Sequence, residues 1–220
     1  MAIKIHGNIQ SSIIDQYSND PLGVGAYHLA SSPELYEVQR DNNFMFEISL
    51  TTNTYGDEVK LRRAGTLDTD RDQVKYFANP DEIIRVSVNK ASVPTYSQDP
   101  IEVNRGNTSI KYAGKIKFSD NIPIQLYDFI GAEVKDILVA WQSLSGNPYT
   151  EKVGHASDYK KEAFLTEYTP DYQIVRRWHL YGCRLSSLSF GDYKYEGGAD
   201  VVQVNANVTY DKAYIEVSGL

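Results

Sequence analysis

The sequence predicts a mainly β fold with one α-helix, arranged as an antiparallel sandwich or barrel, and two observations support this. In the stretch Asp200–Tyr210, apolar and polar residues alternate without a break from Val202 onward. Because side chains alternate between the two faces only in a strand, this stretch is a strand with one apolar and one uncharged polar face. Only one stretch, Ile130 to Leu144, repeats apolar residues at spacings of three and four, which is typical of a helix.

Shorter runs of alternating residues predict the other strands. In chain order they are Phe44–Leu50, Ile84–Val93, Ile101–Val103, Ile110–Phe118, Ile122–Tyr127, Tyr159–Tyr168, Ile174–Cys183 and Leu185–Phe190. We expect Ile110, Tyr112, Ile116 and Phe118 to face the core. Turns are expected at Asn104–Asn107 and at Glu196–Asp200, where glycine supplies the positive φ that tight turns require.

The predicted helix has one apolar stripe. Its residues Val134, Ile137, Leu138 and Trp141, together with Ile130 and Leu144, fall on a single face, so we expect them to pack the helix against the sheet. Asp128 is the expected N-cap, and Gly146 before Pro148 is the expected stop.

Two segments fall outside this core pattern. Residues 1–41 are rich in turn residues and read as an N-terminal arm, followed by a β domain over residues 42–220. Residues 52–82 form a long charged loop, and a loop of this length in a compact domain is usually functional or disordered. Its charged residues are Asp57, Glu58, Arg62, Arg63, Asp68, Asp70 and Asp72.

Composition excludes several classes of protein. The 220 residues include 22 Lys or Arg and 29 Asp or Glu, a formal charge of −7 that disfavours a general nucleic-acid binder. The single cysteine, Cys183, cannot form an intrachain disulfide. Without an apolar signal core or a run of about 20 apolar residues, neither secretion nor membrane insertion is expected.

The sequence offers no convincing site for catalysis, a cofactor or a metal. The four histidines, His6, His28, His155 and His179, are far apart, and a surface or interface position is the better expectation for each. The run Asp68–Asp72 resembles the start of a calcium loop but lacks its later glycine and glutamate. Cys183 is expected to be a buried, inert thiol.

Three classes of function remain open. The exposed edges of an open sheet tend to pair, and a ring of copies joined edge to edge would close them. A structural subunit that assembles in this way would use the arm, the loop and the polar strand together. A monomeric β-sandwich binding module and, with least support, a carboxylate-pair hydrolase are the alternatives.

Several blocks, in order, carry a resemblance to a known family. They are Arg40–Ile48, Ile84–Pro94, Ile110–Gly114, Ala140–Gln142, Tyr159–Lys161, Trp178–Leu188 and Val202–Asp211. With these blocks the chain resembles the tail tube proteins of contractile-tailed bacteriophages, the T4-type tail tube family. More distantly, it is similar to the tubes of secretion systems and contractile injection systems.

The resemblance implies a structural subunit of a phage tail tube, without enzymatic activity. Six copies would form a ring, and stacked rings would conduct double-stranded DNA without binding it specifically. Sheath, baseplate and terminator proteins would be its partners in a virion tail assembled in the host bacterial cytoplasm. The loop 52–82 would reach the adjacent ring. A tube-like baseplate or initiator protein, or an injection-tube subunit, is the alternative within this resemblance.

One hypothesis concerns the polar face of the strand that ends at Tyr210. The uncharged polar face of Gln203, Asn205, Asn207 and Thr209 would line the lumen, because a neutral or acidic wall lets DNA slide past. The equally weighted alternative is that this face is simply the solvated side of a sandwich.

Overall fold

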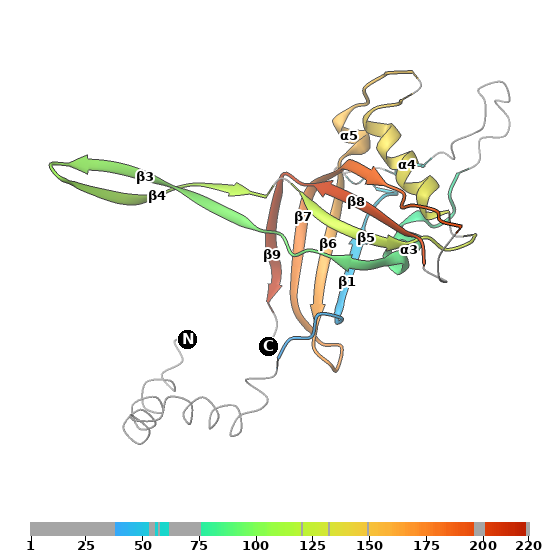
Figure 1. The fold of residues 1–220 in the computed structure, drawn as a ribbon, viewed down its shortest axis with the longest axis horizontal. Coiled ribbons are helices and arrows are strands. Elements are labelled where there is room, and N and C mark those ends of the chain that lie inside the picture. Colours follow the sequence, from blue (N-terminus) through green and yellow to red (C-terminus); the bar gives the residue numbers. More distant parts are fainter. Residues whose placement is uncertain are drawn as a thin grey trace. The chain divides into compact units, whose positions relative to one another are not determined.

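The computed structural model describes residues 38–52, 56, 58–61, 76–119, 121–131, 133–148, 150–195 and 201–218. Residues Asn42–Leu220 make one compact unit. Within it the described strands are antiparallel and form an open sheet and a separate hairpin, accompanied by a few helices (Figure 1). The predicted mainly β, antiparallel class is therefore confirmed, with the qualification that the sheet is not closed into a barrel.

One seven-stranded sheet organises the fold. Its order is β1-β6-β7-β8-β5-β2, with β9 also paired to β7. The strands are β1 (Phe44–Ile48), β2 (Val88–Ala91), β5 (Ile122–Tyr127), β6 (Lys161–Tyr168), β7 (Ile174–Ser189), β8 (Gln203–Thr209) and β9 (Lys212–Ser218).

Strand β7 belongs to two parts of this sheet. As far as Cys183 it pairs with β6 and β9, and from Arg184 onward it pairs with β8. Between these two parts Gly182 has φ +67°, and a Cβ there would lie 2.2 Å from a carboxylate oxygen of Asp211. The sequence pattern predicts two strands here. The structure has one long strand, because a glycine lets the backbone turn without ending the ladder.

The predicted strand at Ile84–Val93 is wrong over its first half. Pro80–Ser87 form helix α3, and only Val88–Ala91 form strand β2. Pro80 lies in the first turn, where its missing N–H costs nothing, and Asp81 and Glu82 follow it at the positive end of the helix dipole. Ile84 and Ser87 are buried at helical spacing, whereas Val86 is exposed.

The predicted long helix exists but is shorter. Helix α4 spans Val134–Ser145 and ends at Gly146, as expected, whereas its N-cap is Glu133 and not Asp128. Ile130 is fully exposed and does not belong to the apolar stripe. A short third helix, α5 (Ala156–Tyr159), follows, so the prediction of a single helix is also wrong.

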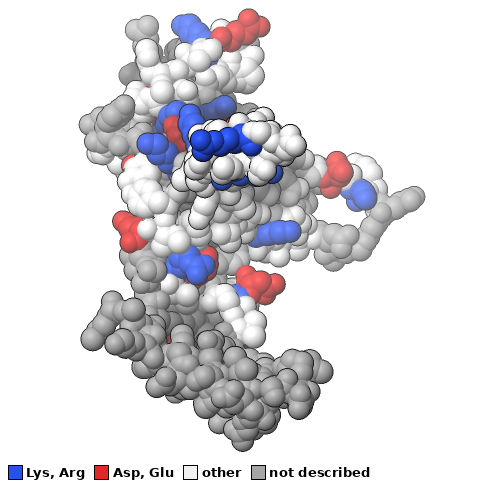
Figure 2. Space-filling model, turned by 90° about the vertical axis from the view of Figure 1, so that its left-hand side faces the viewer, with Lys and Arg blue, Asp and Glu red and all other residues white. Residues whose placement is uncertain are grey.

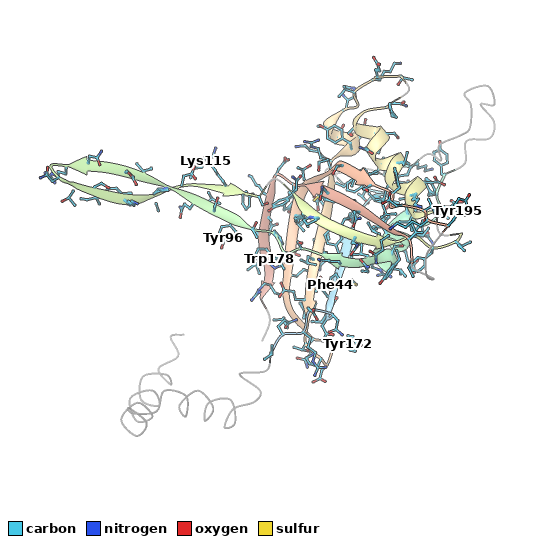
Figure 3. All side chains as sticks on the ribbon, viewed as in Figure 1. Phe44, Tyr96, Lys115, Tyr172, Trp178 and Tyr195 are labelled. Atoms are coloured by element: carbon cyan, nitrogen blue, oxygen red, sulfur yellow. The ribbon has the colours of Figure 1, made fainter. Side chains whose placement is uncertain are left out.

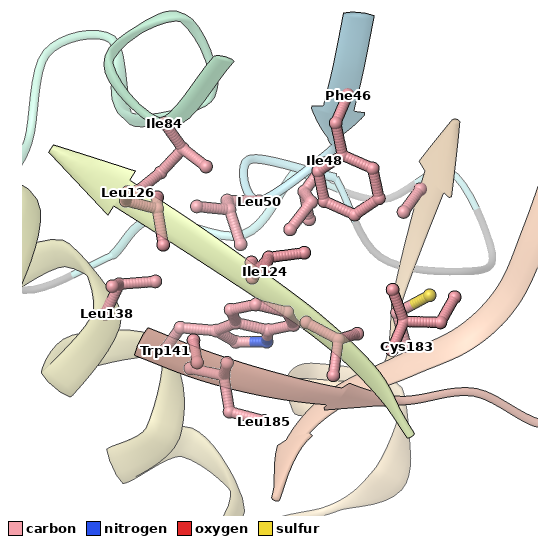
Figure 4. Packing of buried hydrophobic residues seen from close by; sticks show 14 of the residues in the cluster. Phe46, Ile48, Leu50, Ile84, Ile124, Leu126, Leu138, Trp141, Cys183 and Leu185 are labelled. Atoms are coloured by element: carbon pink, nitrogen blue, oxygen red, sulfur yellow. The ribbon is translucent and has the colours of Figure 1, made fainter. Parts of the chain in front are cut away.

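Helix α4 covers the apolar side of the sheet. Val134, Ile137, Leu138 and Trp141 are each at most 1% exposed. Figure 4 shows the Trp141 indole among side chains of the helix and of strands β5 and β7. Its Nε1 donates a hydrogen bond of 2.9 Å to the carbonyl of Tyr159, so the polar atom of this buried ring is satisfied.

Within the described residues, strands β3 (Tyr96–Arg105) and β4 (Thr108–Phe118) pair only with each other, so the core differs from the one expected. The expected turn forms, with Gly106 at φ +64°. The hairpin projects away from the seven-stranded sheet (Figure 1). Ile110, Tyr112 and Ile116 are therefore exposed rather than in the core, and only Phe118, at the root, packs against the core.

Two further differences concern the outer part of the sheet. Strand β9 is not predicted by the sequence pattern. His179 is 6% exposed instead of lying at the surface: its Nε2 lies 3.1 Å from Glu162 and its ring stacks on Tyr181. Cys183 is buried, as expected, and burial raises the pKa of its thiol far above the usual range.

The base of the predicted loop 52–82 is part of the core. Leu61 is buried and its carbonyl accepts a hydrogen bond from the Phe77 amide, whereas no core residue is expected here from the sequence. The Asp81 carboxylate accepts hydrogen bonds from the amides of Leu50 and Thr51. Glu58 bridges to Thr52, and the other six charged residues predicted for an inter-ring role lie outside the described residues.

Candidate functional site: a polar sheet face, two open edges and a hairpin

Four strands present one continuous polar face, which we call the polar face. They are β2, β5, β8 and residues 184–189 of β7, and register places the following side chains on the same side. The polar face consists of Lys90, Pro123, Gln125, Tyr127, Arg184, Ser187, Ser189, Gln203, Asn205, Asn207 and Thr209. The opposite side of β8 carries Val204, Ala206 and Val208, which are buried in the hydrophobic core.

Cross-strand hydrogen bonds hold the amides of the polar face in place. Gln125 donates to Gln203 at 2.6 Å, from β5 to β8. Asn207 donates to the Ser187 hydroxyl at 2.8 Å, from β8 to β7. Side chains that bond across strands in this way lose the freedom to reorient, so the face is a fixed, uncharged wall over its centre.

The four residues predicted from alternation, Gln203, Asn205, Asn207 and Thr209, do share this face. Their neighbours on β5 and β7 are missed, because the pairing of strands far apart in the chain cannot be inferred from alternation within one strand. The two basic residues of the face, Lys90 and Arg184, are missed for the same reason and lie on its two outermost strands.

The polar face ends in two strand edges. Within the described chain β2 pairs only with β5, and residues 184–189 of β7 pair only with β8. Each edge therefore carries backbone N–H and C=O groups free to pair with another strand. The two edges lie on opposite sides of the four-stranded array. One copy could therefore pair at β2 while another pairs at residues 184–189 of β7.

The projecting hairpin is amphipathic. On its distal part Ile101 lies opposite Tyr112 and Val103 opposite Ile110, and these four side chains are between 43% and 57% exposed. The other side carries Glu102 opposite Lys111, joined by an ion pair of 3.2 Å. An isolated two-stranded hairpin is marginally stable in water, so an uncovered apolar face on one indicates a missing partner.

The root of the hairpin is fastened to the sheet. Tyr210 donates a hydrogen bond of 3.0 Å to the carbonyl of Thr95, and the rings of Tyr96, Phe118 and Tyr210 meet edge to face. Figure 3 shows Tyr96 at this root and Lys115 further out. The hairpin is thus held in one direction relative to the polar face instead of swinging freely.

Charge and hydrophobicity differ between the two ends of the molecule. The hairpin carries four basic and two acidic residues in a chain whose net charge is −7. Figure 2 looks onto the side from which the hairpin projects and shows basic side chains grouped at its centre.

At the opposite end of the four strands Tyr195 is labelled in Figure 3, and the connections there expose large apolar side chains. They are Phe129, Ile130, Phe190, Tyr193, Tyr195 and Val201.

Two other polar groupings lie away from the polar face. On the sheet face of β6, β7 and β9, the Tyr181 and Tyr214 hydroxyls meet at 2.8 Å, and this bond raises the pKa of Tyr181 to about 12. Beneath the start of β6, Lys161 is fully buried, and burial lowers the pKa of its ammonium to about 8. We assign no chemistry to either grouping.

The described residues offer neither a metal cluster nor a membrane span. In this part of the chain, no group of three or more His, Cys, Asp or Glu side chains is arranged to hold a metal ion. Among the same residues, no helix is both long and apolar enough to cross a bilayer.

Comparison with solved structures identifies the fold. No protein family and no curated protein matches the sequence. A chain of the extended sheath–tube complex of an extracellular contractile injection system, PVC, has a TM-score of 0.53 at 15% identity, covering 84% of this chain and 96% of that one. The fold is that of contractile injection tubes.

Two further matches point the same way. A chain of the anti-feeding prophage cap, a tube-terminating cap, has a TM-score of 0.52 at 15% identity, with 82% and 92% coverage. A chain of the PVC sheath/tube terminator reaches 0.51 at 17% identity, with 83% and 98% coverage. The coverage shows that nearly the whole of each of these chains shares the fold, and the low identity limits the likeness to the fold.

Proposed function

We propose that this protein is a structural, non-enzymatic subunit of a tail tube. Copies would join edge to edge, with β2 of one beside residues 184–189 of β7 of the next, and close into a ring. The observation that supports this most directly is the open four-stranded polar face, each of whose two edges is unpaired within the described residues. A head-to-tail contact of this kind closes into a ring when the rotation between copies allows it.

The polar face would then line the lumen. We propose six copies in a ring, as the resemblance implies. Four strands from each, spaced about 4.8 Å apart, give a circumference of about 115 Å and a backbone diameter of about 37 Å. Strand tilt would widen this further. Such a lumen accommodates a DNA double helix, and the fixed amides at the centre of the wall offer it no charge to bind.

The hairpin, rather than the charged loop alone, would join one ring to the next. It leaves one end of the four strands, while exposed apolar side chains gather at the other end. The apolar side of a hairpin could therefore cover the apolar end of a copy in the adjacent ring. A contact between two different surfaces does not close on itself along the axis, so rings would stack without limit. The arm 1–41 and the loop 52–82 remain proposed additional contacts.

The proposed setting is a bacteriophage tail assembled in the host cytoplasm, with sheath, baseplate and terminator proteins as partners. Likeness to injection-system assemblies supports a second candidate, a subunit of an injection tube. Likeness to a cap and a terminator supports a third, a protein that forms a single ring at one end of a tube. The length of the assembly distinguishes the last candidate from the first two.

A matched pair of hairpin variants tests the assembly scheme. Val103→Ser with Ile110→Ser removes apolar surface from the exposed side, whereas Glu102→Gln with Lys111→Gln alters the opposite side. Sedimentation and light scattering should show long stacks for the unaltered protein and for the second variant, and single rings for the first. Stacks of equal length in both variants would contradict the role of the hairpin, and monomers throughout would contradict the tube itself.

A further inference from the structure

The polar face carries charge of one sign only. In the described strands that form it, the charged residues are Lys90 and Arg184, and no carboxylate lies among them. Both residues are exposed, and neither forms an ion pair with a described residue. Some other basic residues of the sheet and hairpin do pair, as Lys111 does with Glu102 and Arg176 with Glu167. Two unpaired cations thus lie on one otherwise uncharged face of an acidic chain.

The two cations lie on the outermost strands of the polar face. Lys90 is on β2 and Arg184 is on β7, the two outermost strands of the polar face. In the proposed ring these two strands become neighbours across each joint between copies. The ring would therefore place a Lys90 and an Arg184 from adjacent copies on the lumen side of the same joint. Between joints the wall consists of the amides and hydroxyls of β5 and β8.

We infer that Lys90 and Arg184 form a cationic contact for the phosphate backbone of DNA at each joint of the ring. This inference rests on the proposed function. A guanidinium can hold two phosphate oxygens at once, and an ammonium acts as a compact point charge, so both suit phosphate. Contacts of this kind are independent of base sequence and weaken as salt rises.

Such a wall differs from the neutral or acidic one expected from the sequence. Cations confined to the joints, separated by uncharged strips, would hold a resting DNA loosely and centre it without gripping it along its whole length. The competing explanation is that Lys90 only guards an edge strand, since lysine on an edge discourages unwanted pairing. That explanation would apply equally to Arg184 on the opposite edge, but it predicts no effect of either residue on DNA.

The test uses the full-length protein after assembly and a short fluorescent DNA duplex as the probe. The variants are Lys90→Gln, Arg184→Gln and the double variant. Lys152→Gln is the matched control, because Lys152 is an exposed lysine in the loop after α4 and its replacement removes the same charge away from the polar face. Binding is measured by anisotropy over a range of salt concentrations, and each sample is imaged to count rings and stacks.

The double variant should assemble like the unaltered protein and bind the duplex at least about tenfold more weakly at low salt. The slope of log affinity against log salt should become shallower by about 0.9 for each phosphate that the variant no longer neutralises. Equal binding by the double variant and Lys152→Gln, in samples that do form rings, would overturn the inference and leave the tube intact. Binding of polyglutamate as tightly as the duplex would overturn the assignment to phosphate. Absence of rings in the unaltered protein would contradict the proposed function instead.

Discussion

Replacing Lys161 with methionine should stabilise the protein at neutral pH. Lys161 is fully buried, and its Nζ donates one hydrogen bond of 3.2 Å, to the carbonyl of Thr52. Burial lowers the pKa of the ammonium from 10.5 to about 8, although the charges of Asp81 and Asp158 act to raise it. Methionine has a similar length and carries no charge to desolvate.

The expected gain in stability follows from the pKa of Lys161. A pKa lowered from 10.5 to about 8 corresponds to about 3 kcal/mol by which folding is disfavoured while the group is protonated in both states. Losing the hydrogen bond to the Thr52 carbonyl costs about 1 kcal/mol. Lys161→Met should therefore raise the free energy of unfolding by about 2 kcal/mol at pH 7.

The sign of the pH dependence is fixed by the same values. Between pH 8 and 10.5 the folded protein has released the Lys161 proton while the unfolded chain still holds it, so stability contributed by this group rises with pH. The advantage of the methionine variant should therefore shrink by about 2 kcal/mol between pH 7 and 9.5. Groups common to both proteins cancel in the difference.

Denaturant unfolding at concentrations where both proteins are monomeric measures this difference. Lys152→Met, at an exposed lysine, is the control and should change stability by less than about 0.5 kcal/mol. A methionine variant less stable than the unaltered protein at pH 7, or a difference that does not vary with pH, would refute the reasoning. Either result would mean that the Thr52 carbonyl and the nearby carboxylates compensate the buried charge.

Two further predictions concern the sheet. Gly182→Ala should lower the free energy of unfolding by about 3 kcal/mol, because the new Cβ meets the Asp211 carboxylate and φ is positive. In the Asp211→Ala background the same change should cost only about 1 kcal/mol. Additive effects of the two substitutions in a double-mutant cycle would argue against the clash. Gln203→Lys with Asn205→Lys should slow DNA ejection from assembled particles without preventing assembly, and unchanged ejection would count against a lumen position for these residues.

The parts of the fold that sequence can predict are those in which local pattern and burial agree. Residues 203–209 alternate and form β8 with one buried face, and Val134 to Trp141 repeat at helical spacing and are buried in α4. In both, the apolar residues lie where the pattern places them, because the element packs on one face against the core.

The hairpin could not be predicted as an exposed structure for the opposite reason. Ile101, Val103, Ile110 and Tyr112 alternate like core residues, yet no part of the described chain covers them. If another copy covers them, as we propose, their alternation reflects burial at an interface between copies and not in the core of one chain. The strands were therefore predictable, and the surface that they pack against was not.

Short elements are hard to predict for a different reason. Ile84, Val86 and Val88 alternate over five residues, too few to distinguish a strand from one turn of helix, and Pro80 with the acidic residues after it was the better signal. Alternation within β8 alone indicates the polar face. Its cations on β2 and β7 belong to it only through strand pairing across the chain, which no single-strand pattern reveals.

The most direct test of the central claim is cryo-electron microscopy of the purified protein at rising concentration. We expect rings with a central hole, stacked into tubes, in which β2 of each copy pairs with β7 of its neighbour and Asn205 faces the hole. Monomers at every concentration, or a hole lined by a face other than that of Asn205, would contradict the account.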